Sequence, residues 1–173
     1  MRTVLLALAM SALAIAYAQA QTQAQPDVCE VPEYLTHVEG KFARVPTAVR
    51  KDHRLLVLVI GTGSSSLAGP EGARSAYPAR LEAALASRLP QASVKVVTDV
   101  KGRRTAAEMA AAVAQLVRDE KPDLVIWQTG TVDAMRGVDP DEFRATLEKG
   151  VATARAAGAD VVLMNMQYSP RTE

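Results

Sequence analysis

Beyond residue 53 of this 173-residue chain, short continuous apolar runs alternate with longer segments in which apolar residues recur every three to four positions. The short runs are bounded by charged residues, proline or glycine, as is typical of strands buried on both faces of a sheet. The longer segments are typical of amphipathic helices. We therefore predict strands at 54–61, 92–100, 122–130 and 160–167, and helices at 76–89, 105–120 and 139–158.

Local signals mark the ends of two of these helices. Thr105 and Glu108 have the spacing of a capping box, in which each residue satisfies a free backbone N–H of the first turn. Asp139 and Pro140 supply an N-cap and a first-turn proline, and Gly158 ends the same helix. The boundaries therefore agree with the alternation of strands and helices.

A regular alternation of strands and helices joined by short links predicts an α/β fold. We expect a three-layer α/β/α sandwich with a parallel sheet. In such sheets ligands bind beyond the carboxyl ends of the strands. The loops to search for function are therefore 61–72, 99–104, 129–139 and 167–173.

The first 20 residues have the pattern of an export signal. Arg2 precedes an apolar run rich in Leu and Ala, and Ala-Gln-Ala at positions 18–20 matches the small-x-small pattern of a signal peptidase site. The run is shorter than the roughly 20 apolar residues that a membrane-spanning helix needs. We predict cleavage after Ala20 and a periplasmic or secreted protein without a stable membrane anchor.

The remaining chain divides into an N-terminal arm at 21–53, which contains prolines and has no sustained period, and one α/β domain at 54–173. Cys29 is the only cysteine, so the chain has no internal disulfide. The net charge is +1 and only 4% of residues are aromatic, so neither electrostatic capture of nucleic acid nor base stacking is expected. The sequence does not indicate an oligomeric state.

The loop after the first strand, GTGSSSLAG at 61–69, has three interpretations. A phosphate cradle is disfavoured, because a dinucleotide fingerprint would place glycine where Ser66 stands and a P-loop would need lysine. Asp99 is the only weak candidate for a ribose partner. A serine beyond a buried strand suits a nucleophile, since helix N–H groups can stabilise an oxyanion. A plain helix entry remains equally open from this loop alone.

The other loops favour the nucleophile, because their order and spacing resemble a known family. VLVIGTGSSSLAG, VVTDVKGRRTA and LVIWQTGTVDA look like the first three sequence blocks of the SGNH/GDSL hydrolases, and the resemblance spans about residues 55–170. It implies a flavodoxin-like fold and a serine nucleophile at Ser65, with a shift to Ser64 or Ser66 left open. It also implies that Gly102 donates its backbone N–H to an oxyanion.

The third block implies a role for Asp133, at the family's acid position, although a carboxylate that caps nearby backbone is an equal alternative. Val132 stands where the family has an oxyanion-binding asparagine, and Gln128 or Asn165 remain as substitutes. The family's late Asp-x-x-His block has no counterpart. We therefore expect that the chain lacks the last strand or helix and the catalytic histidine.

The two histidines are poor substitutes for that base. His53 precedes the first strand and so enters at the wrong edge of the sheet, whereas His37 in the arm is unconstrained. The resemblance implies an exported hydrolase of small or carbohydrate-linked acyl esters, with no metal or organic cofactor. Met135 and Arg136 are candidates for the substrate pocket or for ordinary surface. A non-catalytic periplasmic binding or accessory domain is the first alternative, and a nucleotide-binding domain is the second.

Overall fold

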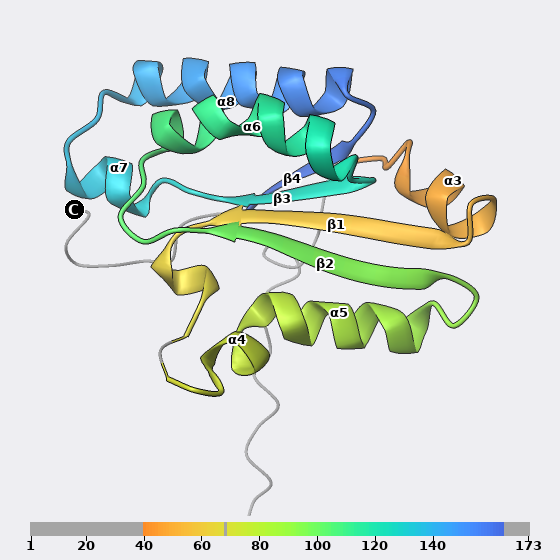
Figure 1. Ribbon diagram of the computed structural model, residues 1–173. Helices are drawn as coiled ribbons and strands as arrows, with labels where there is room; N and C mark the ends of the chain where they lie inside the picture. Colours follow the sequence, from red (N-terminus) through yellow and green to blue (C-terminus); the bar gives the residue numbers. More distant parts are fainter. Residues whose placement is uncertain (1–39, 68, 165–173) are drawn as a thin grey trace, which may run out of the picture. The chain divides into compact units, whose positions relative to one another are not determined.

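The computed structural model describes residues 40–67 and 69–164, and the structural statements below concern these residues. Four parallel strands form one sheet in the order β2-β1-β3-β4 (Figure 1). The strands are β1 Arg54–Gly61, β2 Ser93–Val100, β3 Leu124–Gln128 and β4 Asp160–Met164. The α/β architecture with a parallel sheet is thus confirmed. The predicted end of the last strand, at 165–167, and the loop at 167–173 lie outside the described residues.

The three long predicted helices are present, and three short ones accompany them. The helices are α3 Val45–Arg50, α4 Gly72–Ser75, α5 Tyr77–Arg88, α6 Ala106–Glu120, α7 Thr131–Met135 and α8 Pro140–Ala156, and a 3₁₀ turn spans Gly63–Ser65. Both predicted caps form: Thr105 and Glu108 make the capping box of α6, and the Asp139 carboxylate accepts two backbone N–H groups of α8. The three short helices carry too few apolar positions to show a period.

Helices cover both faces of the sheet, with α6 and α8 on one face and α5 on the other (Figure 1). Side chains alternate along each strand, so each strand contributes to two cores. The core under α6 and α8 includes Leu58, Ile60, Met109, Val113 and Trp127. The core under α5 and α3 includes Val49, Val57, Val59 and Ile126. These two cores give the three layers that the sequence predicts.

The strand register brings the loops that follow β1, β2 and β3 to the carboxyl edge of the sheet. Residue Gly61 at the end of β1 pairs with Val100 of β2, and Ile60 pairs with Trp127 of β3. Because all pairs are parallel, the segments that follow β1, β2 and β3 leave the sheet side by side.

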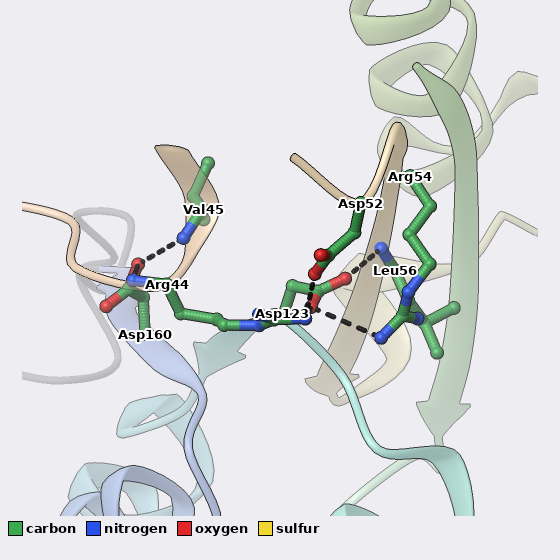
Figure 2. Close-up of polar contacts among 7 residues, drawn as sticks. All are labelled: Arg44, Val45, Asp52, Arg54, Leu56, Asp123 and Asp160. Atoms are coloured by element: carbon green, nitrogen blue, oxygen red, sulfur yellow. Dashed lines mark hydrogen bonds and ion pairs between the residues drawn. The ribbon is translucent and has the colours of Figure 1, made fainter. Parts of the chain in front are cut away.

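At the opposite, amino edge, the carboxylate of Asp123 is a buried polar hub (Figure 2). It accepts the backbone N–H of Leu56 at 2.9 Å and the Nε–H of Arg44 at 2.8 Å. A second guanidinium, that of Arg54, lies 3.6 Å away. Burial opposes the charge of Arg44, but Asp123 and then Asp52 outweigh it, and the pKa of Arg44 is raised. We name this group the amino-edge cluster.

The side chain of Asp160, the first residue of β4, caps the N-terminus of helix α3 (Figure 2). Its carboxylate accepts the backbone N–H groups of Ala43, Arg44 and Val45 at 2.9 to 3.0 Å. A carboxylate at a helix N-terminus satisfies free donors and suits the helix dipole. The last part of the predicted arm therefore forms a helix packed against β1, whereas residues 21–39 of the arm lie outside the described residues.

The predicted signal segment, its cleavage site at Ala20, and Cys29 also lie outside the described residues. In the part of the chain that is described, no helix has the length and apolar character needed to cross a membrane.

Candidate active site

A cavity of about 570 Å³ opens at the carboxyl edge of the sheet, where three loops meet. The loops follow β1, β2 and β3 (Figure 1). The residues that line this cavity include Ser64, Gly102, Arg103, Val132, Met135 and Arg136. The cavity lies at the edge where α/β sheets bind ligands. We call it the edge pocket.

The loop after β1 presents two neighbouring serines differently. Thr62 is extended, and Gly63–Ser65 then forms a single 3₁₀ turn that is closed by a hydrogen bond from the Ser65 N–H to the Thr62 carbonyl. Ser64 is exposed and lines the edge pocket, with its Oγ 3.4 Å from Oγ1 of Thr62. Ser64 is thus the serine of the triplet whose side chain meets the pocket.

Ser65 points into the protein. It is only 2% exposed, and its hydroxyl donates to Oε1 of Gln128 at the end of β3. Gly61 makes room for this arrangement, because a Cβ at that position would collide with the Ser65 side chain. Ser65 and Ser66 line a different hollow of about 250 Å³ between α5 and β2. The side-chain amide oxygen of Gln128 therefore accepts the Ser65 hydroxyl.

Tyr77, at the start of α5, lies near Ser65. Burial raises the pKa of the Tyr77 phenol, and the Ser65 hydroxyl partly offsets this effect. The phenol oxygen is buried near the Ser65 hydroxyl, which itself donates to Gln128. Tyr77 therefore stays neutral at physiological pH and contributes no base to the edge pocket.

The loop after β2 contributes Gly102, Arg103 and a structural arginine. Gly102 lines the edge pocket, and a Cβ at this position would meet no atom within 4 Å. Arg104 is held inward by the Asp99 carboxylate at 2.7 Å and by the Gly61 carbonyl at 3.3 Å. Asp99 is thus committed to Arg104, which disfavours a role as a ribose partner.

The loop after β3 passes through Gly130, whose φ of +105° lies in the region that favours glycine. Val132 lines the edge pocket, as Gly102 does. Asp133 turns away from the pocket: it is 4% exposed and accepts the backbone N–H of Ala106 at 2.8 and 3.1 Å. Its carboxylate therefore fastens this loop to the start of α6.

Within residues 40–67 and 69–164, the pocket holds no group that is free to accept a proton. His53 is the histidine of this range, and it precedes β1 at the amino edge. The carboxylate of Asp99 is paired with Arg104, and that of Asp133 accepts the backbone N–H of Ala106. His37 and Asn165 lie outside the described residues. In the described part of the chain, no three His, Cys, Asp or Glu side chains gather where they could hold a metal ion.

The structure thus brings Gly102 and Val132 together with Ser64, and it leaves Ser65 and Asp133 buried behind the pocket. The roles that the family resemblance gave to Ser65, Gly102 and Asp133 stay predictions. The pocket position of Arg103 was not predicted. Its signal is the Lys-Gly-Arg-Arg run after a strand, although such a run is also typical of an exposed turn.

Comparison with known proteins places this geometry in a family. A model of the non-GDSL lipase-like family matches residues 28–173. An arylesterase of Vibrio mimicus is 29% identical over 135 residues, which are 75% of this chain and 62% of the arylesterase. The esterase TesA of Pseudomonas aeruginosa is 36% identical over 66 residues, which are 38% of this chain and 33% of TesA.

Solved structures of esterases are also similar to this chain. A crystal structure of TesA matches with a TM-score of 0.61 and 30% identity, covering 66% of this chain and 62% of that one. The SGNH-hydrolase family esterase AlinE4 matches in fold, with a TM-score of 0.58 and 22% identity over 68% of this chain and 61% of that one. The chain spans less than two thirds of the length of each of these relatives. The chain therefore belongs to the non-GDSL lipase-like family of the SGNH/GDSL hydrolases.

Proposed function

We propose that this protein hydrolyses small carboxylic esters, including acyl groups carried on carbohydrates, at the edge pocket. The observation that carries the proposal is that Ser64 and Gly102 line one pocket at the carboxyl edge of the sheet. Val132 and Met135 give the same pocket an apolar wall against which an acyl group can pack. The arylesterase and esterase relatives are consistent with this reaction class.

The proposed reaction is acyl transfer through a serine ester. The Oγ of Ser64 attacks the carbonyl carbon as its proton passes to a base, and the carbonyl oxygen becomes an oxyanion beside the Gly102 N–H. The tetrahedral intermediate expels the alcohol and leaves an acyl-serine, which water then hydrolyses. The base comes from outside residues 40–67 and 69–164, because the acidic groups near the pocket are engaged.

Ester hydrolysis and covalent labelling test the function together. We expect the protein to release nitrophenol from 4-nitrophenyl acetate and to form one adduct with an ethyl fluorophosphonate, mapped by mass spectrometry to the peptide that contains Ser64. Prior labelling should abolish hydrolysis, since both reactions use the same hydroxyl. Hydrolysis that persists after complete labelling would contradict the proposal.

Val132 offers a gain-of-function test. Replacing it by Asn supplies a side-chain N–H donor beside Gly102, and we expect kcat for 4-nitrophenyl acetate to rise about tenfold or more. Val132→Leu is the matched control, because leucine has the shape of asparagine without the donor. An equal change in both variants would show that the effect comes from packing and not from oxyanion binding.

A non-catalytic binding or accessory domain is the second candidate, and Val132 favours it, since valine removes a donor that the family uses. This candidate predicts saturable binding of a small ester without turnover and without a phosphonate adduct. We also propose that the protein is exported, as the first 20 residues indicate. The mass of the protein recovered from a periplasmic extract would test cleavage after Ala20.

A further inference from the structure

The edge pocket carries two arginines that the reaction itself does not need. Arg103 and Arg136 both line it, one from the loop after β2 and one from the end of α7. The proposed attack uses a backbone N–H, assigned to Gly102, to stabilise the oxyanion, and this step does not require a guanidinium. Two arginines in a lining that is otherwise uncharged therefore indicate recognition of a charged group on the substrate.

Arg103 is held in an unfavourable backbone conformation. Its φ is +65°, in the left-handed region that glycine and asparagine adopt more readily. A residue with a β-carbon at such a position carries strain, and strained residues gather at functional sites. The Arg136 guanidinium donates to the Arg103 carbonyl at 3.0 Å, which joins the two positions. A long cationic side chain thus occupies a pocket position whose backbone conformation would suit glycine better.

The charge of these arginines is only weakly compensated. Arg103 has no ion pair among the described residues, whereas its neighbour Arg104 is paired with Asp99 at 2.7 Å. The carboxylate nearest to Arg136 is Glu108 at 3.8 Å, beyond hydrogen-bond length. The backbone N–H and then the hydroxyl of Thr105, with a smaller effect of the Arg136 charge, hold the pKa of Glu108 below its usual value, so the main hydrogen bonds of Glu108 are those of its capping box.

We propose that Arg103 and Arg136 form an anion-binding rim, and that the preferred substrates are esters that carry a carboxylate or another small anion near the scissile bond. This inference rests on the proposed function for its substrate class. Guanidinium groups bind carboxylates through charge-assisted hydrogen bonds, and these are stronger beside an apolar wall than in bulk water. The rim discriminates between charged and neutral esters and leaves the attack on the carbonyl unchanged.

Two substrates with the same leaving group measure this preference. They are mono-4-nitrophenyl adipate, which carries a carboxylate too far along the chain to attack its own ester efficiently, and its neutral methyl ester. We expect kcat/KM to be about tenfold higher for the anionic ester at low salt, and the ratio to fall as NaCl screens the charges. In the double variant Arg103→Gln and Arg136→Gln, the ratio should approach one. A ratio that the double variant leaves unchanged would overturn the proposal.

Lys101→Gln is the control for overall charge. Lys101 precedes Gly102, but its amine lies 3.8 Å from Asp99, so the variant removes one positive charge nearby without changing the rim. We expect Lys101→Gln to keep the wild-type ratio. A fall equal to that of the double variant would assign the preference to general electrostatic attraction and would also overturn the rim.

Binding without turnover separates this inference from the proposed function. By titration calorimetry, we expect 4-phenylbutyrate to bind the wild type at least tenfold more tightly than the neutral 4-phenylbutanol, and the double variant to lose this difference. If neither ester is hydrolysed, the proposed function fails, and the calorimetric difference still decides the rim. Equal affinity of the wild type for the acid and the alcohol would exclude the rim even if both esters are hydrolysed.

Discussion

Replacing Ser64 by Ala is expected to lower kcat/KM for 4-nitrophenyl acetate by about 1,000-fold or more, because it removes the proposed attacking hydroxyl. The free energy of unfolding should change little, since Ser64 is exposed and its one side-chain contact is a 3.4 Å approach to Thr62. Steady-state kinetics and urea unfolding of the same preparation measure both effects.

Ser65→Ala is the matched control, and it also tests the alternative that Ser65 is the nucleophile. The side chain is buried and paired with Gln128, so we expect activity within about tenfold of wild type and a loss of about 1 to 3 kcal/mol in the free energy of unfolding. The reverse pattern would assign the nucleophile to Ser65, as the family resemblance implies. It would also mean that the loop turns during catalysis to bring Ser65 into the pocket.

The second large effect concerns stability and the amino-edge cluster. Replacing Asp123 by Ala should lower the free energy of unfolding by about 3 kcal/mol, because the buried N–H of Leu56 loses its acceptor and Arg44 loses one of its two carboxylate partners. Urea unfolding followed by circular dichroism measures the change. The edge pocket lies at the other end of the strands, so ester hydrolysis by the remaining folded protein should be preserved.

Asp52→Ala provides the control for that variant. Asp52 contacts the same guanidinium of Arg44 at 2.7 Å, but its side chain is 36% exposed. Ion pairs at the surface contribute about 0 to 1 kcal/mol. If Asp52→Ala destabilised the protein as much as Asp123→Ala, burial of Asp123 would not be the source of its effect.

The fold was predictable in large part because its two central strands, β1 and β3, are buried on both faces. The run at 54–61 has almost no polar residue, and β3 is buried along its whole length, so a simple apolar count finds both. The caps of α6 and α8 are local signals that act within a few residues. Helix α3 was not predictable in this way, because its N-terminal carboxylate comes from Asp160, more than 100 residues later.

The site was predictable only to the level of its loops. The strand order places the loops of Ser64, Gly102 and Val132 at one edge, and this follows from parallel pairing. Which serine meets the pocket depends on the rotation of one 3₁₀ turn, and a repeated Ser-Ser-Ser contains no signal for that rotation. The rim position of Arg103 likewise depends on a left-handed φ that only the folded loop shows.

The buried carboxylate of Asp123 and the partly buried carboxylate of Asp160 lie at the end of the sheet away from the edge pocket, and this arrangement has an evolutionary consequence. Substitutions at exposed pocket positions such as Ser64 and Arg103 leave this polar anchoring untouched, whereas the buried Ser65 and Asp133 in the same loops also hold the structure together. Val132, a departure from the family pattern, occurs in a loop that Asp133 still fastens to α6. A lineage with this architecture is free to vary the exposed positions of its pocket loops while its folding stays intact.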